Sequence, residues 1–312
     1  MSSPEIVVAS LLGNAVAAGT PLLFGTLGEI YAERSGVLNL GIEGMMAVGA
    51  VTAFGVTLAT ENVWVGVLAA ATIGGLVALV HAFLSITLRA NQVVSGLALT
   101  MFGLGLSGLL GKQYIGKPLP SSLVVKPIFI PLLRDIPILG RFLFQQDLLV
   151  YLSIALVLVL WFVLFKTRIG ISVRSVGEDP ATCDALGVDV YLTRYLCVLL
   201  GGALAGLAGA HLSVAFAPAW TEGMTAGRGW IVVGLTIFAM WRPRRALLGA
   251  YLFGGVEALQ YTLQPLGFSP QLLGMLPYIF AVVVLLVGTR ETIRKRLGAP
   301  AALGVPYARG EK

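Results

Sequence analysis

Apolar runs long enough to cross a bilayer follow one another along almost the whole chain of 312 residues. A helix needs about 20 mostly apolar residues to span the hydrocarbon core. By this criterion about nine spans are predicted, at 6–28, 37–58, 62–88, 91–111, 148–165, 195–216, 229–241, 246–264 and 272–288. Only 12% of the residues are charged, about half the share found in soluble domains, which excludes a soluble globular fold. The sequence therefore predicts an all-α polytopic membrane protein.

The distribution of basic residues predicts how the spans are oriented. Cytoplasmic loops are enriched in Lys and Arg. If the C-terminal tail is cytoplasmic, its side of the membrane carries fifteen of the 21 Lys and Arg. The links that share this side are those at Arg34, Arg89, 166–194 and 242–245. No Lys or Arg precedes Arg34, and the start before the first predicted span carries Glu5 alone, so we predict an external N-terminus and a cytoplasmic C-terminus.

The same map predicts the domain organisation. Residues 1–298 are predicted to form a single transmembrane domain, and 299–312 a cytoplasmic tail. The segment 112–146 is rich in proline and basic residues, is too polar to span, and is predicted to be an extracytoplasmic loop.

Polar residues interrupt two predicted spans near the cytoplasmic side. Ser35 is a helix-start signal, so Asn39 and Glu43, four residues apart, are predicted to share one helix face. A carboxylate at membrane depth is costly and normally faces protein or water. A second polar face at the start of the fourth span is expected to confront the first. The predicted pathway residues are Asn39, Glu43, Asn91, Gln92 and Ser95. In the alternative interpretation Glu43 is a structural acid, hydrogen-bonded to Asn91 or Gln92.

The polar segment 166–189 is predicted to carry a short helix on the cytoplasmic surface. Asp179 is suited to cap it, Pro180 fits its first position, and Gly187 fits its C-terminal stop. Such a helix has little core of its own, so we predict that a partner protein covers it, with Arg174, Glu178 and Leu186 among the contacts. The alternative is a surface loop whose helix has no partner.

Small residues recur at four-residue spacing in the sixth predicted span. The two rows are Gly202, Gly206, Ala210 and Ala205, Gly209, Ser213. Small-xxx-small rows let helix backbones touch inside a membrane. This span is therefore predicted to lie inside the bundle.

Residue types argue against catalysis by this chain. Its two cysteines and two histidines are too few and too scattered for a disulfide framework or a metal site. His81 and His211 lie within spans, and we interpret each as a hydrogen-bonded packing histidine rather than as a proton relay. No nucleophile–base constellation is apparent, so no enzymatic activity and no cofactor are expected in the chain.

Four stretches together carry a family resemblance. They read ERSGVLNLGIEGMMAVGA, TRIGISVRSVGEDPATCDALGVDV, GGALAGLAGAHLS and TEGMTAGRGWIVVGLTIFAMW. In this order they resemble the branched-chain amino acid and simple-sugar branch of bacterial ABC-importer permeases, from about residue 15 to 287. The first stretch is most similar to the nucleoside-type permeases, which work with a lipoprotein binding protein of the basic-membrane-protein class.

The resemblance implies a type II importer fold in the bacterial inner membrane. It implies three partners: a second permease of the same fold, an ATPase that binds ATP and Mg²⁺, and an extracytoplasmic binding protein. By position, the residues that match the family's ATPase-coupling segment are Gly177, Glu178, Asp179, Pro180 and Gly187. Sugar permeases of this family generally begin with one more span, for which residues 1–28 leave no room.

Two classes of function are open from the sequence. In the first the chain is an importer permease that passes a small neutral polar solute, a nucleoside or alternatively a simple sugar. In the second it is an ion-coupled secondary transporter that uses Glu43 and Glu257 as proton or ion sites. The docking helix separates the two, because an ion-coupled carrier does not need one.

Overall fold

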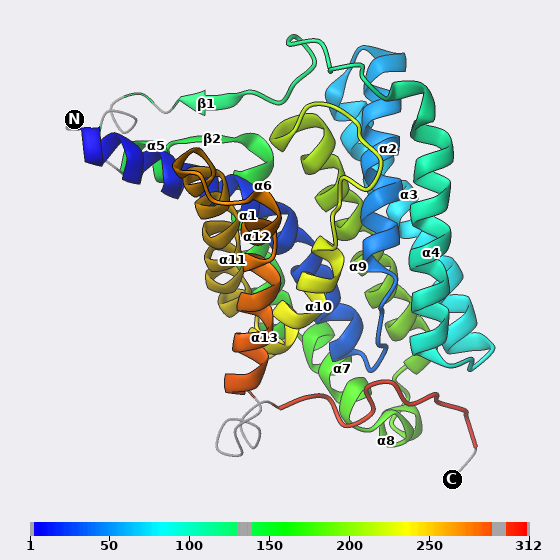
Figure 1. Ribbon diagram of the computed structural model, residues 1–312. Helices are drawn as coiled ribbons and strands as arrows, with labels where there is room; N and C mark the ends of the chain where they lie inside the picture. Colours follow the sequence, from blue (N-terminus) through cyan, green and yellow to red (C-terminus); the bar gives the residue numbers. More distant parts are fainter. Residues whose placement is uncertain (1–2, 130, 132–135, 137–138, 289–297, 311–312) are drawn as a thin grey trace.

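The computed structural model describes residues 3–129, 131, 136, 139–288 and 298–310. Within these residues the chain is a helical bundle with one small antiparallel sheet at one end (Figure 1). The long helices are α1 (Ser3–Arg34), α2 (Ile42–Thr60), α3 (Val63–Ala82), α4 (Gln92–Gly111), α6 (Leu148–Lys166), α9 (Val190–His211) and α11 (Pro243–Leu263). The short ones are α5 (Leu139–Leu143), α7 (Arg168–Glu178), α8 (Pro180–Ala185), α10 (Arg228–Phe238), α12 (Pro270–Gly274) and α13 (Leu276–Gly288).

Six helical stretches in the described residues are long and apolar enough to cross a membrane. They are Val7–Arg34, Ile42–Thr60, Val63–Thr87, Gln92–Tyr114, Leu148–Lys166 and Val190–Phe216, and they correspond to the first six predicted spans. The last three predicted spans are also helical, in α10, α11 and α12–α13, but they are shorter or less apolar. The chain is thus a multi-pass membrane protein, and the number nine stays a prediction.

The predicted helix start at Ser35 is wrong. The Ser35 hydroxyl donates to the Ala32 carbonyl at 2.7 Å, and α1 ends at Arg34. In the next turn the Asn39 carboxamide oxygen accepts from the Gly41 amide at 2.9 Å. Such local side-chain bonds compete with helix formation, so α2 begins only at Ile42. Asn39 therefore lies before the helix and does not share a helix face with Glu43.

Helix α9 is the centre of the bundle and packs against α1, α2 and α3. The predicted small-residue rows are confirmed as contact surfaces. A Cβ added at Gly206 would lie 2.1 Å from the Ala70 carbonyl oxygen of α3, and one at Gly209 would lie 2.0 Å from the Met46 carbonyl oxygen of α2. Helix α11 packs along α1, and α4 packs along α2.

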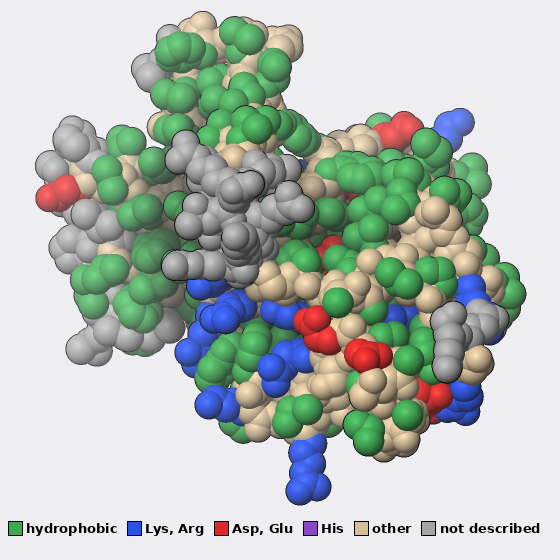
Figure 2. Space-filling model, turned by 90° about the horizontal axis from the view of Figure 1, so that it is seen from below, with side chains coloured by type: hydrophobic (Ala, Val, Ile, Leu, Met, Phe, Trp, Pro, Cys, Tyr) green, Lys and Arg blue, Asp and Glu red, His purple; other side chains and the backbone are tan. Residues whose placement is uncertain are grey.

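The two ends of the bundle differ in charge. Helices α7 and α8 and residues 298–310 lie at the lower end in Figure 1, and Figure 2 shows Lys and Arg side chains gathered on this face. We call it the basic end. The start of α1 lies at the opposite end, together with strands β1 (Pro127–Phe129) and β2 (Gln145–Asp147). The strands pair antiparallel, with Ile128 opposite Gln146.

The predicted tail, as far as it is described, packs on the basic end rather than extending away from it. The Ala302 amide donates to the Gly177 carbonyl of α7 at 2.9 Å, and the Gly304 amide donates to the Gly36 carbonyl after α1 at 3.2 Å. Arg309 forms an ion pair with Asp184 of α8 at 2.5 Å. The segment 298–310 thereby connects the ends of α1, α7 and α8.

Candidate functional site

The Glu43 carboxylate joins the start of α2 to the start of α10. One oxygen accepts from the Thr225 hydroxyl at 2.5 Å and from the Gly227 amide at 2.8 Å. The other oxygen accepts from the Gly229 amide at 2.5 Å. Glu43 is only 4% exposed. The first amides of a helix lack intrahelical acceptors and carry partial positive charge, so a carboxylate there is well placed.

This contact lies deep in the membrane-spanning part of the bundle. Helix α10 has 11 residues and so is about 16 Å long, roughly half of a hydrocarbon core of about 30 Å. Arg242 at the basic end follows shortly after its last turn. Figure 1 shows α10 beginning near the middle of the bundle. The chain therefore has a discontinuous helix whose N-terminus points into the membrane interior, as at the substrate sites of many transporters.

Two of the other predicted pathway residues, Gln92 and Ser95, help to hold the segment 35–41 against the start of α4. The Gln92 carboxamide oxygen accepts from the Leu38 amide at 2.7 Å. Ser95 bonds His81 Nδ1 at 3.0 Å, and His81 Nε2 lies 3.1 Å from the Leu38 carbonyl oxygen. His81 is thus the hydrogen-bonded packing histidine that the sequence indicates. The structure does bring the two polar stretches together, as expected.

Two members of the predicted set serve only their own helix start or turn. The Asn91 side chain caps α4 by accepting from the Val94 amide at 3.1 Å. Asn39 is fully buried, and its side-chain nitrogen Nδ2 lies 3.8 Å from the Met45 sulfur. The Glu43 carboxylate bonds to neither Asn91 nor Gln92 in the described structure, so the partners proposed for a structural Glu43 were wrong. The true partners lie more than 180 positions later in the chain.

Three further buried carboxylates lie beside this region: Glu29 and Glu33 were not predicted as site residues, and Glu257 was named only in the ion-coupled alternative. Glu29 accepts from the backbone amide of Asn39 at 3.2 Å, and Glu33 accepts from the Trp241 indole. Glu257 of α11 forms a buried ion pair with Arg228, the first residue of α10. The sequence signal that could have found Glu29 and Glu33 is a pair of acidic residues four positions apart in an otherwise apolar stretch. Because Arg228 neutralises Glu257, the structure offers little support for Glu257 as an ion site.

The helix that is predicted to couple to the ATPase has the predicted capping residues. Helix α8 spans Pro180–Ala185, and the Asp179 carboxylate accepts from the Thr182 amide at 3.0 Å. Hydrogen bonds from Thr182 hold the pKa of Asp179 below its usual value. Gly187 has φ +84°, and the Val188 amide donates back to the Cys183 carbonyl at 3.0 Å. This is the Schellman geometry that a glycine stop permits.

The α7–α8 surface contains a groove of about 500 Å³. Its lining includes four of the predicted coupling residues, Arg174, Glu178, Asp179 and Leu186. Two apolar side chains of this lining are exposed, Ile171 at 56% and Leu186 at 78%, and apolar side chains exposed together mark a binding surface.

Gly177 is not part of the exposed α7–α8 surface, and its predicted contact with a partner is wrong. It is buried, and a Cβ there would lie 2.1 Å from the Arg34 carbonyl oxygen. Its own carbonyl oxygen accepts a hydrogen bond from the Ala302 amide. Gly177 therefore lets α7 approach the end of α1, and its role is packing.

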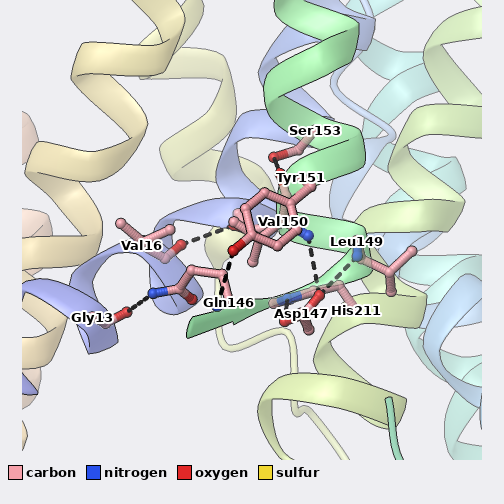
Figure 3. Close-up of polar contacts among 10 residues, drawn as sticks. Gly13, Val16, Gln146, Asp147, Leu149, Val150, Tyr151, Ser153 and His211 are labelled. Carbon is pink, nitrogen blue, oxygen red and sulfur yellow. Dashed lines mark hydrogen bonds and ion pairs between the residues drawn. The ribbon is translucent and has the colours of Figure 1, made fainter. Parts of the chain in front are cut away.

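A second polar cluster lies at the opposite end (Figure 3). The Asp147 carboxylate caps α6 by accepting from the Leu149 and Val150 amides at 2.8 and 3.0 Å, and it contacts His211 Nε2 at 3.2 Å. Gln146 donates to the Gly13 carbonyl of α1 at 3.4 Å. His211 is fully buried and acts here as a packing histidine between α9 and α6.

Comparison with known proteins identifies the chain. The family model described as branched-chain amino acid transport system / permease component matches residues 11–287. The chain belongs to this permease family. No solved structure matches the permease.

Curated relatives of the permease are similar to it over almost their full lengths. The putative glucose ABC transporter permease protein TsgC13 of Haloferax volcanii is 42% identical, over 96% of this chain and 98% of the relative. The guanosine ABC transporter permease protein NupQ of Bacillus subtilis is 37% identical, over 94% of each. The nucleoside ABC transporter permease protein NupC of Lactococcus lactis is 34% identical, over 98% of each.

Family membership settles the class of function. The protein is the permease component of an ABC transporter, a non-catalytic subunit that spans the membrane several times. A permease of this kind works with an ATPase and a solute-binding protein.

The Asp147 cap predicts a pH-dependent contribution to the stability of the permease. Burial raises the pKa of Asp147, but the His211 contact and the two amides outweigh burial and keep the pKa below its ordinary value. A lowered carboxyl pKa stabilises the fold above the unfolded-state pKa of about 3.9, and this stabilisation is lost as the pH falls through the folded-state pKa.

We therefore expect Asp147→Ala to lower the free energy of unfolding by about 1–2 kcal/mol at neutral pH. The difference from the unmodified permease should shrink below about pH 4. Thermal midpoints of the detergent-solubilised protein between pH 3.5 and 7 measure this. Asp147→Asn, which can still cap a helix, is the matched control and should cost less. A constant Asp147→Ala deficit down to pH 3.5 would contradict the assignment.

Proposed function

We propose that this permease forms the translocation pathway of an importer for a neutral solute that carries a sugar ring. Nucleosides are the first candidate, because two long matches are permeases named for guanosine and for nucleosides. A simple sugar is the second, because the match at 42% identity is named as a putative glucose permease. In the described interior the acids are hydrogen-bonded or paired with arginine, which suits passage of a neutral solute.

In this proposal the basic end faces the cytoplasm, in agreement with the positive-inside rule. Residues at the α7–α8 surface contact the ATPase. The observation that carries this assignment is the groove, in which two large apolar side chains, Ile171 of α7 and Leu186 after the firmly capped α8, are left exposed. Exposed apolar patches outside the membrane mark protein-binding surfaces.

The proposed assembly contains a second, homologous permease subunit, so that two chains enclose the pathway. The external binding protein docks at the opposite end, where β1, β2 and the start of α1 lie. ATP and Mg²⁺ bind to the partner ATPase. The assembly resides in the cytoplasmic membrane of a prokaryotic cell.

Reconstitution tests the function. Proteoliposomes containing both permeases and the ATPase, supplied with binding protein, should accumulate radiolabelled guanosine, or alternatively glucose, only with ATP. Omitting the ATPase is the control. Uptake by this chain alone under a proton gradient, independent of ATP, would instead support a secondary transporter.

A further inference from the structure

A small polar cavity lies beside the start of the discontinuous helix α10. It has a volume of about 180 Å³ and lies between α10, α11 and the α12–α13 segment. Its polar lining includes Arg228, Glu257, Gln260, Tyr261 and Tyr278. Since α10 is about half as long as the hydrocarbon core is thick, Arg228 at its first position lies near the membrane midplane.

The two charged side chains of the cavity wall neutralise each other, but one of their hydrogen-bond donors has no acceptor. Arg228 and Glu257 are 9% and 7% exposed and form an ion pair. Within the described structure the Arg228 Nε–H is buried and has no acceptor. An unmet donor at this depth costs free energy, so a shift of the Arg228 side chain that lets a ligand in the cavity accept from it would be favourable.

Other groups of the wall offer complementary hydrogen bonds. Gln260 lies one turn beyond Glu257 on α11 and lines the same cavity. A carboxamide both donates and accepts, and a carboxylate accepts at several positions. Tyr278 donates to the Ala226 carbonyl and so fixes the opposite wall. A net-neutral wall with mixed donors and acceptors suits a hydroxylated, uncharged ligand.

We propose that this cavity binds two adjacent hydroxyl groups of the solute's sugar ring during translocation. The inference rests on the proposed function and names the part of the solute that is recognised. Glucose and guanosine, for which two relatives are named, both carry adjacent ring hydroxyls. The cavity is about six times the ~30 Å³ that one water molecule occupies in the liquid, enough for a single sugar ring. Glu257 accepts from one hydroxyl, and Gln260 and Arg228 Nε bond the other.

Uptake by the reconstituted transporter tests the proposal. The binding protein is saturated in turn with guanosine or 2′-deoxyguanosine, and with glucose or 2-deoxyglucose, so that delivery is equal and the rate reports on the permease. We expect the complete solute to be transported at least about fivefold faster than its deoxy analogue. Gln260→Leu should abolish most of this preference, and so should Glu257→Gln. Gln264→Leu, at an exposed glutamine outside the cavity lining, is the matched control and should retain it.

The outcomes separate the site from the general function. Full preference retained in both Gln260→Leu and Glu257→Gln would overturn the site. So would equal rates for the complete and deoxy solutes in the unmodified transporter. The readout is the ratio of the two uptake rates within each variant, so a general loss of activity that slows both solutes equally does not count as a loss of preference. If the unmodified transporter takes up neither guanosine nor glucose with ATP, the proposed function itself fails, and this inference fails with it.

Discussion

Glu43→Ala is expected to prevent the permease from assembling. The change removes the acceptor of three hydrogen bonds and leaves the Thr225 hydroxyl and the Gly227 and Gly229 amides without it. A buried polar group that loses its partner costs about 1–3 kcal/mol. For the three groups together this is about 3–9 kcal/mol, a large part of the 5–15 kcal/mol by which domains are typically stable. The start of α10 would lose its connection to α2.

The conservative variant Glu43→Gln should also be harmful, though less so. Both carboxylate oxygens accept from backbone amides, whereas a carboxamide offers one oxygen and turns a donor toward the other amide. We expect a loss of about 1–3 kcal/mol.

Size-exclusion yield and thermal midpoint of the solubilised permease measure both changes. Glu222→Ala, which removes an exposed carboxylate near the same segment, is the matched control. If Glu43→Ala and Glu43→Gln both assemble with normal yield and midpoint but lose uptake, Glu43 has a pathway role rather than the structural role that its contacts indicate.

Leu186→Asp is expected to reduce ATP-driven uptake by about 100-fold while the permease itself folds normally. The side chain is exposed in the isolated chain, so the change leaves the fold of the subunit intact. In the assembled transporter it would replace an apolar contact, worth about 1.5–3 kcal/mol, with a charge that is buried unpaired at additional cost. A loss of about 3 kcal/mol corresponds to roughly 100-fold weaker association.

Co-purification of the ATPase and uptake by proteoliposomes measure this effect. Val305→Asp is the matched control, because Val305 is also an exposed apolar residue at the basic end, at 53%, but does not line the α7–α8 groove. A cysteine at Ala185, an exposed position of α8, should crosslink to the ATPase. Normal uptake and normal ATPase recovery in Leu186→Asp, together with no crosslink at Ala185, would refute docking at this surface.

Local features of the molecule could be predicted from the sequence because their causes are local. The start and stop of α8 depend on Asp179, Pro180 and Gly187, all within nine positions, and the structure has the predicted capping bonds. Six apolar runs became helices long enough to span because length and hydropathy are sufficient to specify such a helix. The small-residue rows of α9 likewise predicted close helix contacts, although not which helices would be contacted.

Tertiary structure alone decided how the polar residues are used. The sequence predicts that Glu43 is a costly carboxylate that must face protein or water. Its partners lie from Thr225 to Gly229, at the start of α10, where the sequence predicts a span at 229–241. The resemblance predicts Gly177 as a coupling residue, but in the structure the tail and the end of α1 cover it. Hydrophobic patterning states which residues must be buried and leaves open against what. The hydrogen-bond partners of a buried charge, and the backbone that packs against a glycine, are distant groups that only the packing of the helices brings into contact.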